Sequence, residues 1–135
     1  MGNDGSMEKS LLDINSRRRE GITVLDVRGE IIAYTGALLK DALLEAAGGG
    51  AQPHVLVNMQ DVGIMDSSGL GALLQAMKQA LPSTLHFYRC SHHVRRVLQI
   101  TGLDEVFDLH ESEEEALAHA QSAPASEIPA VARMM

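Results

Sequence analysis

The sequence predicts an α/β fold, in which one domain contains a mixed four- to five-stranded sheet with helices packed on it, in the order β-β-α-β-α-β-α-β-α. Two observations support this prediction. From Val55 onward, short runs of Leu and β-branched residues alternate with stretches of helical apolar spacing, which is typical of parallel strands joined by right-handed crossovers. The length of 135 residues suits one domain and leaves too little chain for two.

The first two elements are expected to form an antiparallel pair of strands. Leu11–Asn15 and Ile22–Ile32 are short β-prone runs. The charged stretch between them ends in Glu20-Gly21, which is a turn signal. A hairpin therefore opens the domain.

A helix and a central strand follow the hairpin. Thr35 can cap the helix, and the three glycines at positions 48–50 end it, because glycine accepts the left-handed conformation that terminates helices. Val55-Leu56-Val57 is a continuous apolar run, as expected for a strand in the middle of the sheet. The apolar residues on one face of the helix are Leu38, Leu39, Ala42, Leu43 and Ala46.

The next helix has the clearest amphipathic pattern in the chain. It is expected to end before Pro82, and Leu85–Tyr88 predicts the strand that follows. Its apolar stripe consists of Leu70, Leu73, Leu74, Met77 and Leu81.

The last predicted elements are two helices and a short strand. Ser91 caps a helix that Gly102 ends, and Val106–Leu109 gives a strand. Ser112 begins a capping-box signature for a terminal acidic helix that runs to about His119.

Both ends of the chain are expected to lie outside the domain, which we place at residues 10–121. Residues 1–6 are polar and precede a second methionine, Met7, as in a leader added for expression. Residues 122–135 are rich in Ala, Pro and Ser without periodicity, which predicts a flexible tail.

The composition argues against several functions. The net charge is −7, and the basic residues are not concentrated on one predicted helix, which disfavours nucleic-acid binding. No apolar run approaches the roughly 18–20 residues that span a bilayer, so we expect a cytoplasmic protein that does not bind membranes. The lone Cys90 suits a reducing compartment, and aromatic residues make up only 3% of the chain, so ligand binding by stacking is disfavoured.

The segment Met65–Gly71 (MDSSGLG) stands out because it follows the central strand and opens the most amphipathic helix. Hydroxyl groups at a helix start satisfy free N–H groups, so Ser67 or Ser68 can be a simple N-cap, with Asp66 as a favourable charge beside the helix dipole. The residues alone leave this structural role and a functional role equally open.

Two catalytic or cofactor motifs fit this segment poorly. A nucleophile elbow centred on Ser67 requires a glycine where Met65 stands. A dinucleotide-binding fingerprint built on Gly69 and Gly71 requires a third glycine at Leu74. No acid, base and nucleophile converge in the sequence, so neither an enzyme nor a cofactor is predicted.

Histidine and cysteine residues give no strong metal signal either. Cys90, His92 and His93 cluster in sequence, but adjacent histidines point to different sides of a helix and no second ligand cluster accompanies them. We therefore expect no metal. The remaining histidines occur singly and are interpreted as surface residues: His54, His86, His110 and His119.

Two segments resemble the bacterial anti-sigma-factor antagonists, which are STAS-domain proteins. Val55–Gly71 (VLVNMQDVGIMDSSGLG) is similar to the signature segment of that family, and Ser91–Phe107 is similar to its later helix. Gly29-Glu30 with Thr35 resembles the earlier strand-to-helix junction. The resemblance runs from Leu11 to Leu117 and implies a single STAS domain.

This resemblance implies a phosphorylation switch. In such proteins the serine directly after the aspartate is phosphorylated by a partner that is both a serine kinase and an anti-sigma factor, and this position is Ser67 rather than Ser68. A PP2C-type phosphatase is then expected to reverse the modification. Asn58 and Asp61 match polar positions before the motif. The residues implied for partner binding are Asp66, Ser68, Gly69, Leu70, Thr35 and Gly36.

One departure from the family pattern follows the Gly29-Glu30 pair. The family often has an acidic residue there, near the phosphorylation site, whereas this chain has Ile31-Ile32, which predicts a more apolar contact surface. A second hypothesis is a STAS scaffold subunit of a larger signalling or transporter-associated complex, in which Ser67 is only a cap. A stable complex that is indifferent to phosphate would favour the scaffold.

Overall fold

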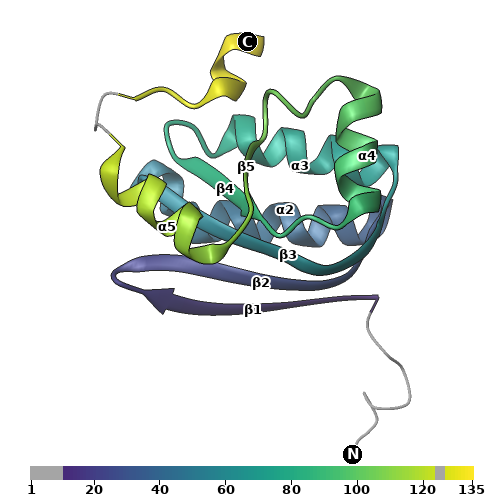
Figure 1. Cartoon of the computed structure of the whole chain (residues 1–135), viewed down its shortest axis with the longest axis horizontal. Coiled ribbons are helices and arrows are strands. Elements are labelled where there is room, and N and C mark those ends of the chain that lie inside the picture. The colour runs from purple at the N-terminus through teal and green to yellow at the C-terminus, as the bar shows by residue number, and fades with distance from the viewer. Residues whose placement is uncertain (1–10, 124–126) are drawn as a thin grey trace, which may run out of the picture.

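Five strands form one mixed sheet in the computed structural model, which describes residues 11–123 and 127–135 (Figure 1). The strands lie in the order β1-β2-β3-β4-β5, with β1 antiparallel to β2 and the other neighbours parallel. The predicted α/β fold is confirmed. The strands are β1 (Leu12–Arg19), β2 (Ile22–Ile31), β3 (His54–Met65), β4 (Thr84–Tyr88) and β5 (Asp108–His110).

Helices cover both faces of this sheet. In Figure 1, α5 lies in front of the strands and α2 and α3 lie behind them. Successive residues of β3 point to opposite faces of the sheet. Val55 and Val57 pack in the larger apolar core with α2 and α3, whereas Leu56 packs in a smaller apolar core with α5. The helices are α2 (Ala33–Ala47), α3 (Ser67–Gln79), α4 (His92–Thr101) and α5 (Glu113–Ser122), with short 3-10 turns η1 (Gly48–Gly50) and η2 (Ala130–Met134).

The opening hairpin is longer than predicted. Glu20 and Gly21 form a two-residue turn with φ angles of 51° and 83°, as their sequence suggests. The charged residues 16–19 continue β1, however, instead of forming a loop, because they pair in register with β2 up to Arg19 opposite Ile22. These side chains alternate along a sheet edge, where charge is well tolerated.

Helix α2 begins before Thr35. The N-cap position is Ile32, and Thr35 is the third helical residue. The Thr35 hydroxyl accepts a hydrogen bond from the Ile32 N–H at 2.9 Å and donates one to the Glu30 carbonyl at 2.6 Å. Thr35 therefore fixes the β2-to-α2 junction from inside the helix. The helix ends at Gly48 in the left-handed conformation, as predicted.

Strand β3 extends well beyond the predicted Val55–Val57 run. It continues through Met65, and its pairing with β2 reaches Ile31 opposite Met65, past two irregularities in register. This pairing absorbs the segment that we expected to be a connection after Asp61. As a result, α3 starts directly beside the end of β2.

The C-terminal elements differ from prediction in the length of α5 and in the packing of the last residues. Ser91 and Ser112 are N-caps as predicted, whereas α5 extends past His119 to Ser122. Val131 is buried in the larger apolar core, so the prediction of a flexible tail is wrong for residues 127–135. The proposed leader, residues 1–6, lies outside the described residues.

Candidate functional site

The start of α3 presents two serines to solvent. Asp66 is the N-cap, and its Oδ1 accepts a hydrogen bond from the Gly69 N–H at 2.8 Å. The capping role that the sequence assigned to Ser67 or Ser68 therefore belongs to Asp66. Ser67 is the first helical residue, and Asp66, Ser67 and Ser68 are all exposed. We call these three residues the serine end.

Glycine contacts hold the serine end against the start of α2. A Cβ atom added at Gly69 would lie 2.0 Å from the carbonyl oxygen of Ile31, which is backbone and cannot move aside cheaply. A Cβ atom at Gly36 would lie 2.9 Å from the Cβ of Ala72 and 3.3 Å from the Cα of Gly69. The Asp66 N–H also donates to the Ile31 carbonyl at 3.2 Å. The two helix starts are thus locked together by backbone contact.

The structure separates the predicted partner-binding residues into two groups. Asp66 and Ser68 flank Ser67 on the surface. The other four residues, Thr35, Gly36, Gly69 and Leu70, are buried, with Thr35 only 1% exposed. Their burial in the free chain means that these four residues are not on its exposed surface, and their role in partner binding stays a prediction.

Exposed apolar side chains lie at the same edge of the sheet. Tyr34, in the first turn of α2, is 71% exposed, and Ile64, three residues before Ser67, is about half exposed. Leu38 is also exposed, although the sequence placed it on the buried face of α2. Ile31 is fully buried and Ile32 only partly exposed. The expected apolar surface therefore comes from Tyr34 and Ile64 more than from the Ile31-Ile32 pair.

A second polar site was missed by the sequence interpretation. Four histidines interpreted from the sequence as scattered surface residues gather in one cluster, and three of them lie near Asp108. Two are buried: His86 is 1% exposed and His110 is 7% exposed. The surface interpretation is wrong for these two. The histidine cluster, as we call it, consists of His54, His86, His110 and His119 together with Asp108.

The other candidate ligand set is not assembled. Cys90 is buried, and burial raises the pKa of its thiol to about 11, which keeps it protonated at neutral pH. His92 and His93 occupy the exposed first turn of α4. Within the described residues, the histidines that approach a carboxylate are His86, His110 and His119 of the histidine cluster.

The chain belongs to the STAS domain family, whose model matches residues 13–116. Among its relatives is the anti-sigma-B factor antagonist of Bacillus subtilis (strain 168), which is 27% identical over 100 residues, covering 73% of this chain and 90% of the relative. No helix in residues 11–123 or 127–135 combines the length and apolar character needed to cross a membrane.

Solved structures of antagonists share the fold. An anti-sigma factor antagonist from Mycobacterium paratuberculosis superimposes with a TM-score of 0.73 at 23% identity, covering 82% of this chain and 95% of that one. The antagonist SpoIIAA is similar in its unphosphorylated form, with a TM-score of 0.67 at 23% identity, covering 83% of this chain and 99% of that one. Its phosphorylated form from Bacillus is also similar, with a TM-score of 0.60 at 23% identity, covering 79% and 98%.

Proposed function

We propose that this chain is an anti-sigma-factor antagonist that binds an anti-sigma factor with serine kinase activity while Ser67 is unmodified and releases it when Ser67 is phosphorylated. The observation that carries the proposal is that Asp66 and Ser67 have separate roles at the start of α3. Asp66 caps the helix and leaves the neighbouring Ser67 exposed. A kinase can therefore reach and modify Ser67 without removing the hydrogen bond that starts the helix.

The relatives support the choice of partner. The curated relative is named as an antagonist of an anti-sigma factor, and SpoIIAA has been solved both with and without phosphate. By analogy, this chain acts as a binding protein rather than an enzyme and regulates transcription in the cytoplasm. A PP2C-type phosphatase would return it to the binding state.

Charge supplies the switch in this proposal. A phosphate adds roughly 1.5 to 2 negative charges at pH 7. The first turn of α3 tolerates such a group, because its N–H groups lack helical partners and the helix dipole favours an anion. A close protein interface does not tolerate it, because desolvating an unpaired charge costs on the order of several kcal/mol, and each ~1.4 kcal/mol is tenfold in affinity. Asp66 adds to the repulsion from any acidic partner surface.

The packing of the serine end supports a switch that acts at the surface. Gly69 and Gly36 are packed against backbone and neighbouring helix atoms, so the serine end has little freedom to rearrange when phosphate is added. The exposed side chains of Tyr34 and Ile64 offer apolar contacts at the same edge. We therefore expect the partner to contact the serine end and these two side chains, and to lose affinity through charge rather than through unfolding of α3.

Two measurements test the function. Phosphopeptide mass spectrometry on the native protein, isolated from its own cells with phosphatases blocked, should find phosphate on Ser67. With the anti-sigma factor that co-purifies, Ser67→Ala should bind as tightly as the unmodified chain, whereas Ser67→Asp should bind at least tenfold more weakly. Ser122→Ala and Ser122→Asp are the matched controls and should differ little, because this exposed serine ends α5 on the other face of the sheet.

Two outcomes would contradict the proposal. Equal binding by Ser67→Ala and Ser67→Asp would exclude the charge switch. Absence of phosphate across growth and stress conditions, despite coverage of residues 59–78, would favour a STAS scaffold subunit in a larger complex.

A further inference from the structure

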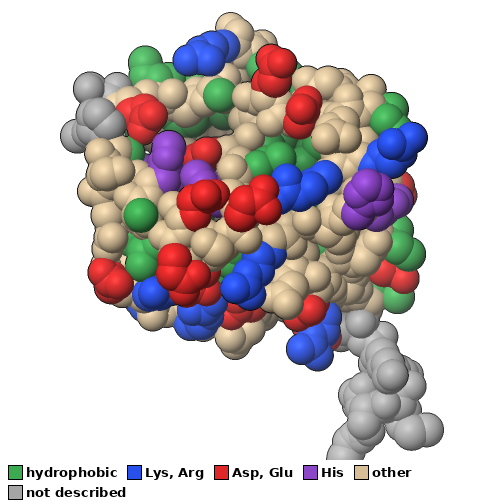
Figure 2. Space-filling view, viewed as in Figure 1, with side chains coloured by type: hydrophobic (Ala, Val, Ile, Leu, Met, Phe, Trp, Pro, Cys, Tyr) green, Lys and Arg blue, Asp and Glu red, His purple; other side chains and the backbone are tan. Residues whose placement is uncertain are grey.

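The histidine cluster lies at the other end of the sheet from the serine end. His54 begins β3 and Asp108 begins β5, whereas Ser67 follows the carboxyl end of β3. His86 comes from β4 and His119 from α5. In the space-filling view, histidine side chains reach the surface between α5 and the C-terminal segment, beside acidic side chains (Figure 2). The two sites therefore share the sheet but no residue.

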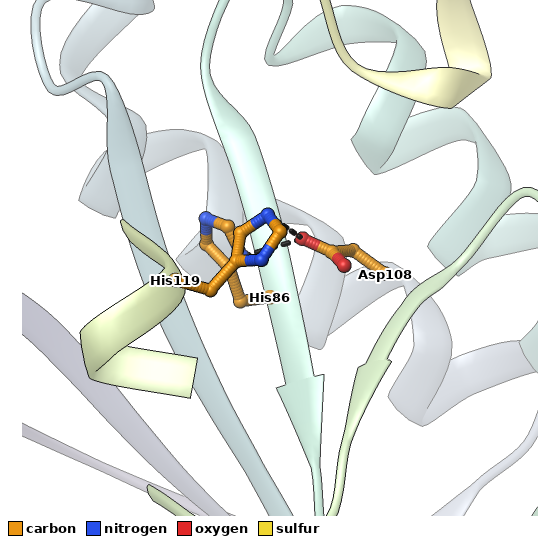
Figure 3. Close-up of side chains that lie close together, drawn as sticks. All are labelled: His86, Asp108 and His119. Atoms are coloured by element: carbon orange, nitrogen blue, oxygen red, sulfur yellow. Dashed lines mark ion pairs between the residues drawn. The ribbon is translucent and has the colours of Figure 1, made fainter. Parts of the chain in front are cut away.

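Three side chains of the cluster converge on one point. Figure 3 shows the rings of His86 and His119 and the carboxylate of Asp108 turned toward one another from β4, α5 and β5. Their candidate ligand atoms all lie within 4.8 Å of one another. Oδ2 of Asp108 is 2.6 Å from Nδ1 of His86 and 3.9 Å from Nε2 of His119. Ligand atoms around tetrahedral Zn²⁺, with bonds of about 2.0–2.2 Å, are about 3.4 Å apart, so small side-chain shifts would complete such a geometry.

The pairing between His86 and Asp108 does not satisfy His86 as a hydrogen bond. Its Nδ1 atom is close to the carboxylate oxygen, but within residues 11–123 and 127–135 it has no hydrogen-bond partner of acceptable geometry, and the side chain is 1% exposed. Buried polar atoms without a partner are rare, because desolvating them is costly. A cation between the nitrogen and the oxygen would satisfy both atoms at once.

The surrounding residues can orient these ligands. Nε2 of His86 lies 2.9 Å from Nδ1 of His54. With Nδ1 of His86 on a metal, Nε2 carries the hydrogen and donates to His54, which is the indirect support that metal-binding histidines usually have. Nε2 of His110 lies 3.2 Å from the second oxygen of Asp108, and its Nδ1 lies 3.5 Å from Oε1 of Glu115.

A cavity gives access to the site. It has a volume of about 210 Å³ and is lined by Asp108, His119 and Glu127 among other residues. An ion can enter from this side, and a water molecule can occupy a coordination position that the three side chains leave open.

We propose that His86, Asp108 and His119 bind one first-row transition-metal ion, with Zn²⁺ as the leading candidate. Two imidazoles and one carboxylate suit Zn²⁺, Co²⁺ or Ni²⁺, whereas Ca²⁺ and Mg²⁺ prefer sets made of oxygen alone. The ion links β4, β5 and α5, three elements that meet at this edge of the sheet. The proposal does not depend on the function of Ser67.

Titration of the metal-free full-length chain with ZnCl₂ by calorimetry tests the site. We expect one ion per chain. His119→Gln should weaken binding by more than about 100-fold, because loss of even an indirect partner of a metal ligand typically costs about 10- to 100-fold. His119 is exposed on α5, so this variant should fold. The control is the double variant His92→Gln with His93→Gln, whose exposed histidines lie outside the cluster and should not matter.

A second measurement on the unaltered chain makes the test independent of any variant. On addition of ZnCl₂, the ring-nitrogen NMR signals of His86 and His119 should shift together at one equivalent, and those of His92 should not. Absence of saturable binding, unchanged affinity in His119→Gln, or loss of binding in the His92/His93 variant would each overturn the proposal.

Discussion

The two faces of the sheet are held in different ways. Behind the strands, α2 and α3 pack aliphatic side chains on β3, and at the serine end the contact closes to backbone distance through Gly69 and Gly36. In front, α5 covers only a small apolar cluster that includes Leu56 and Tyr88, with polar groups on both sides of it. Close apolar packing therefore holds the helices on the back face, and charged and polar contacts largely hold α5 on the front face. The exposed Ser67 lies on the part that changes of pH or ions should affect least.

The front face has a second group of charges besides the histidine cluster. Arg17 bonds to Asp26 at 2.7 Å and to Glu113 at 2.6 Å, and the Tyr88 hydroxyl donates to Glu113 at 2.8 Å. The hydrogen bonds from Arg17, and then those from Arg19 and Tyr88, lower the pKa of Glu113 to about 2. We call Arg17, Asp26, Tyr88 and Glu113 the Arg17 network. It ties α5 to strands β1, β2 and β4.

The largest expected loss of stability comes from disrupting the close packing on the back face. Gly69→Ala places a methyl group 2.0 Å from the Ile31 carbonyl oxygen, so backbone must move, and we expect a loss of about 3 kcal/mol or more in the free energy of unfolding. Gly71→Ala is the control, because that helical glycine is exposed and no atom of the described residues lies within 4 Å of the added group. This variant should gain up to about 1 kcal/mol. Urea denaturation measures both. A loss below about 1 kcal/mol for Gly69→Ala would show that the contact yields easily.

The next effect tests the charge-dependent face. The pKa of Glu113 is about 2 in the folded chain and about 4.5 when unperturbed, so its contribution to stability is complete above about pH 4.5 and disappears as the pH falls toward 2. Because Arg17 is 36% exposed and solvent screens the pair, we expect Glu113→Gln to lose only about 1–2 kcal/mol at pH 7. It should also flatten the decline in stability between pH 4.5 and 2.

Glu114→Gln is the matched control for this acid dependence. Glu114 is exposed, and Arg19, at 3.5 Å, is its one partner in the part of the chain that the structure describes, so its loss should cost less than about 0.5 kcal/mol. Thermal unfolding followed across pH 2–7 distinguishes the two variants. Parallel pH profiles for Glu113→Gln and the unaltered chain would mean that another carboxylate controls acid stability.

The same contrast explains what the sequence could predict. The alternation of strands and helices and the caps Ser91 and Ser112 were predicted correctly, because each signal lies within a few residues. The length of β3 was not, since pairing with β2 determines where it ends. At the start of α3, aspartate and serine are equally good caps, so only the geometry identifies Asp66.

The sequence did not predict the histidine cluster, for a related reason. Its members come from β3, β4, β5 and α5, and no spacing along the chain marks residues that meet through strand register and helix docking. One clue was present: His86 and Tyr88 are two residues apart in the predicted strand Leu85–Tyr88 and so lie on the same face. A helix packed on that face would bury both. The burial of Val131 had no comparable local signal, because the surrounding segment lacks periodicity.

The smallest expected effect is a difference in stability between two variants of the serine end, which tests whether Asp66 supports folding while Ser67 does not. Asp66→Ala removes the hydrogen bond to the Gly69 N–H and should lose about 1 kcal/mol in the free energy of unfolding. Ser67→Ala removes an exposed hydroxyl that does not cap the helix and should stay within about 0.5 kcal/mol of the unaltered chain. Urea denaturation of both variants checks this. Equal losses would mean that Ser67 shares the cap, and phosphate on Ser67 would then disturb the start of α3 as well as the surface charge.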